Sequence, residues 1–136
     1  MTVDMVNNPP HYNNHPSGIE VIEITEGMGF CAGNAVKYIL RHNKKGNPKQ
    51  DLEKALWYIK REAPWVETEY DIGDAVSDSN PMLTLAEQET YKTLTRYLIA
   101  DDELPLALRL TLVDLCERSY RNAYRRLSEY LEGFDS

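Results

Sequence analysis

Apolar residues recur at helical spacing on both sides of one short basic turn, within the stretch from Phe30 to Glu62. Steps of three and four residues separate the apolar positions before the turn, and the same steps return after it. This period predicts two helices, and the short connection predicts that they are antiparallel neighbours. The positions expected to be buried are Ala32, Ala35, Val36, Ile39 and Leu40 in the first helix and Leu52, Ala55, Leu56 and Ile59 in the second.

The turn between these helices contains residues that end one helix and begin the next. Gly46 suits the end of the first helix, because glycine adopts the left-handed conformation without a steric cost. Asn47 is a good N-cap, and Pro48 fits the first helical position. Gln50 completes an Asn-x-x-Gln variant of the capping box. We therefore expect the second helix to begin at Pro48.

The chain before this hairpin predicts an irregular lead-in and one more helix. Residues 1 to 17 are rich in Asn, Pro and His and have no periodicity. Ser17 and Glu20 then form a Ser-x-x-Glu capping box, which predicts a helix from about Gly18 to Met28.

The C-terminal part predicts two further helices. Thr84 and Glu87 form a capping box that opens a helix to about Ala100. A long helix is expected from about Leu104 to Glu132. The expected buried positions are Leu85, Leu94, Tyr97 and Leu98 in the first of these and Leu106, Leu110, Val113, Cys116, Tyr120, Ala123, Leu127 and Leu131 in the second.

These elements together predict an all-α fold, because no strand pattern of useful length occurs. We expect a single domain over residues 1–136, with a core at 1–64, an acidic linker or flap at 65–81 and a C-terminal helical pair at 82–136. The long C-terminal apolar stripe exceeds what one small core covers, so we expect a homo-oligomer built through the C-terminal helices.

Charge is distributed unevenly along the chain. Between Asn34 and Glu62, eight Lys or Arg residues stand against three Asp or Glu residues, a local charge of +5 in a chain of net charge −7. A basic island in an acidic protein predicts a localised anion, of which phosphate is the obvious candidate, and argues against general binding to nucleic acid or anionic membrane. The alternative is a solvated helical hairpin with ordinary surface lysines.

The termini and cysteines predict a soluble protein of the cytoplasm. The N-terminal sequence has no apolar run typical of a signal peptide, and no segment reaches the length of a membrane span. Cys31 and Cys116 lie in helical apolar patterns and are not spaced as a metal or redox pair, so we expect small buried residues in a reducing compartment.

The N-terminal segment is dense in reactive side chains. His11 and His15 are four residues apart, but neighbouring prolines exclude a continuous helix, so a zinc site is disfavoured. We expect a loop that folds back over the hairpin and offers His11, Tyr12, His15 and Ser17 to a ligand.

Two runs of the sequence resemble a known family. They are HYNNHPSGIEVIEITEGMGFCAGNAVKYILRHNKKG and DLEKALWYIKRE, which contain the patterns HY-x-x-HPSGIE, GNA-x-KYI-x-R and DL-x-KA-x-WY. They resemble a domain of unknown function common in tailed bacteriophages, one branch of which is known as a nucleotide kinase. The resemblance covers about residues 6–62.

This resemblance implies a phage protein, acting in the host cytoplasm, that moves a phosphoryl group from ATP or another nucleoside triphosphate to a deoxynucleoside monophosphate. The motif positions are His11, Tyr12, His15, Ser17, Glu20, Asn34, Lys37, Tyr38, Arg41, Asp51, Lys54, Trp57 and Tyr58.

Physical chemistry suggests roles for these positions. Phosphoryl transfer mostly requires positioning and neutralisation of charge, for which Lys37, Arg41 and Lys54 are expected to converge across the hairpin. Asp51 or Glu20 would hold Mg²⁺ through water or orient the cations, although Glu20 is equally explained as a helix cap.

The remaining motif residues suit contacts with a base or sugar. Asn34 and Tyr38 can hydrogen-bond either, while Tyr12 or Trp57 can stack on a base, and Tyr58 shares the polar face of its helix with Lys54. The sequence has no G-x-x-x-x-G-K-[ST] loop. Any kinase activity is therefore expected from a helical site.

Two other functions remain open. An all-α Mg²⁺-dependent nucleoside triphosphate pyrophosphohydrolase would use Glu-x-x-Glu and a second acidic pair. Glu20 and Glu23 fit the first half, but Asp51 and Glu53 are two residues apart and cannot share a helix face well. The other alternative is a phage binder without chemistry that sequesters a nucleotide or inhibits a host protein.

Overall fold

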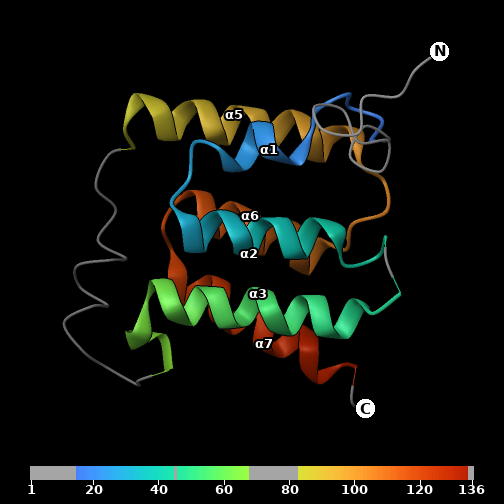
Figure 1. Ribbon diagram of the computed structural model, residues 1–136, viewed down its shortest axis with the longest axis vertical. Helices are drawn as coiled ribbons and strands as arrows, with labels where there is room; N and C mark the ends of the chain where they lie inside the picture. The colour runs from blue at the N-terminus through green and yellow to red at the C-terminus, as the bar shows by residue number, and fades with distance from the viewer. Residues whose placement is uncertain (1–14, 45, 68–82, 135–136) are drawn as a thin grey trace.

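The computed structural model describes residues 15–44, 46–67 and 83–134, and these residues contain helices and no strand. The all-α prediction is confirmed. Along the chain (Figure 1) the helices are α1 (Val21–Thr25), α2 (Phe30–Arg41), α3 (Pro48–Glu62), the 3-10 helix η2 (Pro64–Glu67), α5 (Leu85–Ala100), α6 (Leu106–Cys116) and α7 (Tyr120–Glu132).

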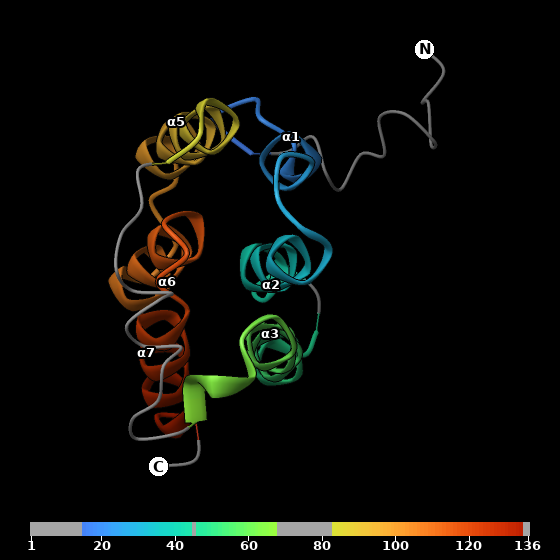
Figure 2. The ribbon, with the colours of Figure 1, turned by 90° about the vertical axis from the view of Figure 1, so that its left-hand side faces the viewer.

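The α-helices form two layers of three. Figure 2 shows α1, α2 and α3 in one layer and α5, α6 and α7 in the other. Across the layers α1 contacts α5, α2 contacts α6 and α3 contacts α7, and within each layer successive helices contact each other. Both layers contribute to one hydrophobic core, which extends from Ile24 to Leu131. The N-terminal helices therefore bury their apolar stripes against the C-terminal ones.

The hairpin of α2 and α3 has the predicted form. The two helices run in opposite directions (Figure 1), and the backbone N–H of Gln50 donates to Asn47 Oδ1 at 3.1 Å, with Pro48 as the first residue of α3. All the positions expected to be buried are buried except Leu56, which is partly buried. Periodicity and the Asn47 cap predicted this hairpin, but the prediction that Gly46 ends the first helix is wrong, because α2 ends at Arg41 with His42 as its C-cap.

The helix before the hairpin is shorter than predicted. α1 begins at Val21 with Glu20 as its N-cap, and the backbone N–H of Glu20 donates to Glu23 Oε2 at 2.6 Å. The predicted helix from Gly18, capped by Ser17, is wrong. Gly18 has a φ of 74°, a left-handed conformation that an α-helix does not contain.

The predicted long C-terminal helix is two helices. α6 ends at Cys116 and α7 begins at Tyr120, and between them Arg118 has a φ of 62°. The backbone N–H of Ser119 donates to the carbonyl oxygen of Asp114 at 2.8 Å, which closes this turn. The break allows α7 to fold back against both α6 and α3.

The buried face of α6 also differs from the prediction. Leu106 and Leu110, expected in the core, are 69% and 37% exposed, whereas Leu108 and Leu112 are fully buried. Two residues along an α-helix correspond to a rotation of roughly 200°, so Leu106 and Leu110 lie nearly opposite the buried leucines. Cys116 is buried as predicted, and Val113 is partly buried. The sequence LALRLTLVDLC is apolar on most sides, and its periodicity could not select between them.

Helix α5 begins as predicted but covers less core than expected. Thr84 Oγ1 accepts from the backbone N–H of Glu87 at 3.1 Å, and Glu87 accepts from that of Thr84 at 2.9 Å, which confirms the capping box. Leu85 at its start and Ile99 near its end are each 80% exposed, although Leu85 was expected to be buried. α1, which faces α5 across the layers, has 5 residues against 16, and cannot cover both ends.

Candidate functional site

Three cationic side chains surround one tyrosine on the α2–α3 hairpin. Lys37 Nζ lies 5.0 Å, Arg41 Cζ 4.6 Å and Lys54 Nζ 5.4 Å from the centroid of the Tyr38 ring. Lys37, Tyr38 and Arg41 belong to α2, and Lys54 comes from α3, so the antiparallel packing brings them together. We call these four residues the cation–tyrosine cluster. The expected convergence of the three cations is therefore present.

The cluster contains one carboxylate. Asp51 Oδ1 lies 3.3 Å from Arg41 Nη2, and the side chain of Asp51 is 6% exposed. Three cations and one carboxylate leave a net charge of +2, which attracts an anion. Asp51 thus contacts one of the three cations, and the two roles suggested for it stay predictions.

Aromatic side chains continue the surface away from the cations. Tyr58 stacks on Tyr38, with ring centroids 5.9 Å apart and planes inclined by 14°. Trp57 and Phe30 each stand nearly perpendicular to Tyr58, at centroid distances of 5.0 and 6.1 Å. Trp57 is 57% and Phe30 76% exposed, so this part of the hairpin presents aromatic surface to solvent.

Phe30 was not among the residues selected from the sequence. It occupies the first position of α2, directly after Gly29, where a helical period has just begun and does not yet indicate a face. The only signal in the sequence was its spacing of four residues from Asn34. In the structure Asn34 Nδ2 donates to the backbone oxygen of Phe30 at 2.8 Å.

Two other predicted residues lie apart from the cluster. The side chain of His15 is 4% exposed, and its Nε2 lies 2.9 Å from Asp101 Oδ2 at the end of α5. Its ring stacks on Tyr97 at a centroid distance of 3.5 Å. The hydroxyl of Ser17 lies 2.7 Å from His15 Nδ1. Both side chains thus attach the lead-in to α5 instead of extending over the hairpin.

The hydrogen bonds define the His15 tautomer and hold Asp101 charged. The backbone N–H of Ser17 donates to His15 Nδ1, so Nε2 carries the proton that is donated to Asp101. Burial raises the pKa of Asp101, but hydrogen bonds from His15 and from two backbone N–H groups outweigh it and place this pKa below its ordinary value. The contact is therefore a structural anchor with a charged acceptor.

Of the remaining predicted residues, Glu20 is engaged at the start of α1, where it serves as the N-cap. The cap interpretation of Glu20 accounts for its position. His11 and Tyr12 lie outside the described residues. Among the residues that the structure describes, no group of three or more His, Cys, Asp or Glu side chains is placed to hold a metal ion. None of the described helices is both long and apolar enough to span a membrane.

Comparison with known proteins gives a family match over residues 6–60. No curated protein and no solved structure matches the chain. The cation–tyrosine cluster, Asp51, Trp57 and Tyr58 all fall inside the matched segment, whereas α5, α6 and α7 fall outside it. Residues 6–60 match the model of a family described as a protein of unknown function, DUF3310.

Proposed function

We propose that the protein binds a nucleotide on the exposed face of the α2–α3 hairpin. The phosphate groups bind between Lys37, Arg41 and Lys54, and the base lies against Trp57 and Phe30. The observation that supports this most directly is the gathering of three cations around one tyrosine ring with a single carboxylate among them.

Phosphate matches the geometry of the cations. Each charge-assisted hydrogen bond to phosphate contributes on the order of 1.5–3 kcal/mol where water is excluded, and less at an exposed lysine. Arg41 is the best placed of the three, because Asp51 contacts Nη2 and so fixes the orientation of a guanidinium that is one-quarter exposed. Lys37 and Lys54 approach from two different helices and can contact different oxygens.

The aromatic residues suit the base. Stacking of a base on an aromatic side chain contributes about 1–3 kcal/mol and tolerates different bases. Trp57 and Phe30 are both exposed and are connected to the cluster through the stacked Tyr58 and Tyr38 rings. Phosphate and base contacts therefore lie on one continuous surface.

Phosphoryl transfer is the reaction we propose at this face, from a nucleoside triphosphate to a deoxynucleoside monophosphate. Such transfer depends on positioning and on neutralisation of the phosphoryl oxygens, both of which the cluster can supply. The resemblance to the phage family branch named above supports this proposal only through the shared motif residues. For the pyrophosphohydrolase alternative, the Glu-x-x-Glu pair is engaged in the cap of α1, where Glu23 accepts a hydrogen bond from the backbone of Glu20.

The test measures binding and turnover together. The protein is incubated with ATP and each deoxynucleoside monophosphate, with and without Mg²⁺, and the products are separated by chromatography. Diphosphate products support the kinase, release of pyrophosphate supports the pyrophosphohydrolase, and tight binding without turnover supports a binder. Binding itself is measured by isothermal titration calorimetry.

Variants connect any binding to the cluster. Lys37→Ala or Arg41→Ala should weaken nucleotide binding or turnover by at least about tenfold, or roughly 1.4 kcal/mol. The control is Lys92→Ala, which removes an exposed lysine of α5 paired with Glu89 and should have almost no effect. Unchanged binding in folded Lys37 and Arg41 variants would show that the cluster is only a solvated face.

Self-association stays a prediction. Leu106 and Leu110 of α6 share an exposed face, and Ile99 of α5 is also exposed, so the C-terminal layer offers apolar surface to a second copy. A monomeric mass by light scattering at micromolar concentration would contradict a homo-oligomer.

A further inference from the structure

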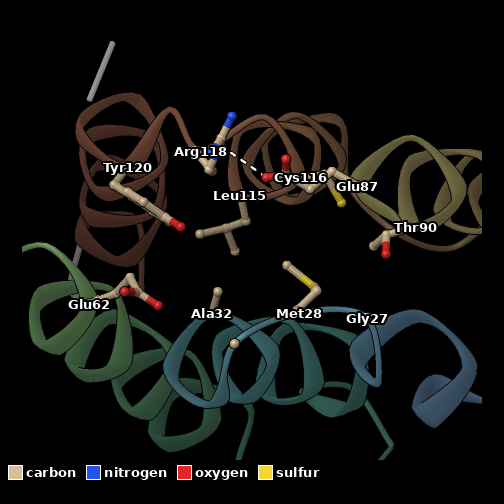
Figure 3. A pocket seen from close by; sticks show the side chains of 11 residues that line it. Gly27, Met28, Ala32, Glu62, Glu87, Thr90, Leu115, Cys116, Arg118 and Tyr120 are labelled. Carbon is tan, nitrogen blue, oxygen red and sulfur yellow. Dashed lines mark ion pairs between the residues drawn. The ribbon is translucent and has the colours of Figure 1, made fainter. Parts of the chain in front are cut away.

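A pocket lies between the two helical layers, away from the cation–tyrosine cluster. Figure 3 shows the residues that line it, which come from α2, the loop before it and α3 on one side and from α5, α6, α7 and the turn between α6 and α7 on the other. Its volume is about 240 Å³. The residues that line it are Gly27, Met28, Gly29, Ala32, Glu62, Glu87, Thr90, Leu115, Cys116, Arg118 and Tyr120.

The cations and carboxylates of this pocket do not balance. Arg118 Nε lies 3.0 Å from Glu87 Oε2, and Glu87 also accepts the backbone N–H of Thr84 in the cap of α5. Glu62, at the end of α3, forms no ion pair with any described residue. Two carboxylates and one guanidinium leave a net charge of −1, located at Glu62.

Glu62 faces the interior of the pocket beside a hydroxyl group. Figure 3 shows its carboxylate and the hydroxyl of Tyr120 directed toward the same space. Burial, and then the negative charge of Glu62, raise the pKa of Tyr120 to about 12, so the hydroxyl stays neutral. Burial likewise raises the pKa of Cys116 to about 12, which keeps the thiol protonated.

The remaining residues that line the pocket are apolar or have their polar group in a hydrogen bond within the protein. Met28, Ala32 and Leu115 contribute hydrocarbon and thioether surface, and Thr90 Oγ1 donates to the backbone oxygen of Ala86 at 3.2 Å. An apolar body would thus contact α2 and α6, while a polar end would reach Glu62.

We propose that this pocket binds a small organic monocation, an ammonium or amidinium group on a compact apolar body, with the cationic group paired to Glu62 and the Tyr120 oxygen. A cationic group can pair with the Glu62 carboxylate, which a neutral ligand cannot do, and an anionic ligand would face two carboxylates. The volume is below the roughly 300–1,000 Å³ of pockets for drug-sized ligands, which restricts the ligand to a fragment. The proposal is independent of nucleotide binding at the hairpin.

The test uses three probes that differ in charge at nearly constant shape. Phenethylamine is a cation, 2-phenylethanol is neutral and phenylacetate is an anion. Each is titrated into uniformly ¹⁵N-labelled protein, and amide chemical shifts are followed by NMR. We expect phenethylamine to bind at least about tenfold more tightly than 2-phenylethanol, with the largest shifts at residues around Gly29, Cys116 and Tyr120.

Matched variants identify the group that binds the cation. Glu62→Gln preserves the shape of the side chain and should weaken phenethylamine binding by at least about tenfold. Glu53→Gln removes an exposed carboxylate of the same helix and should change the affinity for phenethylamine by less than about twofold. Tyr120→Phe removes only the hydroxyl and should weaken binding less than Glu62→Gln.

Three results would overturn the proposal. They are equal binding of the amine and the alcohol, shifts confined to another surface, and unchanged amine binding in a folded Glu62→Gln variant. Circular dichroism verifies that each variant is folded. If Glu62→Gln fails to fold, Tyr120→Phe decides: weaker amine binding supports the proposal, and unchanged binding overturns it.

Discussion

The cation–tyrosine cluster and the pocket between the layers share helices α2 and α3 but differ in every other respect. The cluster is positive and partly exposed, and its four residues lie within one hairpin. The pocket is negative and enclosed on two sides, and its residues extend from Gly27 to Tyr120. One hairpin thus presents opposite charge on its two sides.

The difference shows how each surface arises. A cluster on adjacent helix turns follows from the 3.6-residue period and one short connection, so nearby sequence specifies it. A pocket between layers exists only after the layers pack, because its walls come from helices that are distant in sequence. Substitutions should therefore affect the cluster mainly through charge and the pocket mainly through packing.

The largest stability effect is expected at the carboxylate of the cluster. Asp51→Ala removes the nearly buried partner of Arg41 Nη2, and Arg41 Nε has no hydrogen-bond partner among the described residues. Because the Arg41 charge that remains is only one-quarter exposed, loss of its partner should lower the free energy of unfolding by about 2–3 kcal/mol. Urea denaturation measures this change.

Glu53→Ala is the matched control for Asp51→Ala. Glu53 is exposed on the same helix, and its removal should change stability by less than about 0.5 kcal/mol. Equal effects of the two substitutions would mean that the Asp51–Arg41 contact does not hold the cluster together.

A smaller effect is expected where the wall of the pocket is tightest. A Cβ added at Gly27 would stand 2.5 Å from Thr90 Oγ1, so Gly27→Ala forces α5 and the loop before α2 apart. Overpacking of this kind should destabilise the protein by about 1–3 kcal/mol. Thermal denaturation measures the effect in the single variant and in the Gly27→Ala, Thr90→Ala double variant.

The double variant isolates the contact. Because Thr90→Ala removes the obstructing oxygen, the cost of Gly27→Ala should fall when both are present. Additive effects would indicate that another contact, and not the approach of Gly27 to Thr90, limits this wall.

The smallest stability effect is expected from substitution of Arg118, the one cation among the described residues that line the pocket. This substitution increases the difference in charge between the pocket and the cation–tyrosine cluster. Arg118→Gly relieves the left-handed backbone, which costs an ordinary residue about 1–2 kcal/mol, and removes an ion pair that contributes roughly 0–1 kcal/mol. The free energy of unfolding should change by less than about 1 kcal/mol. The Arg118→Gly substitution should also make the net charge of the pocket more negative.

Ligand binding distinguishes the two surfaces in the Arg118→Gly variant. Binding of phenethylamine should become tighter, measured by the same NMR titration, whereas nucleotide binding measured by calorimetry should not change. Weaker amine binding would show that Arg118 supports the shape of the pocket more than it opposes the charge of the ligand.

The sequence by itself determined the hairpin and the position of its cations. The Asn47 cap and Pro48 set the start of α3, and the helical period placed Lys37 and Arg41 on one face of α2. The Thr84–Glu87 capping box similarly set the start of α5. Local hydrogen bonds and the helix period act within a few residues, so nearby sequence encodes them.

Only the tertiary structure decided the rest. His15 was expected to contact a ligand, but in the structure it is buried against Tyr97 and lies 2.9 Å from Asp101. α6 is apolar on most sides, so the choice of its buried face depended on which helices it met, and the turn at Arg118 set where α7 folded back. The pocket around Glu62 depends on all of these choices at once. Contacts between distant residues depend on how whole helices pack, and a local pattern does not contain that information.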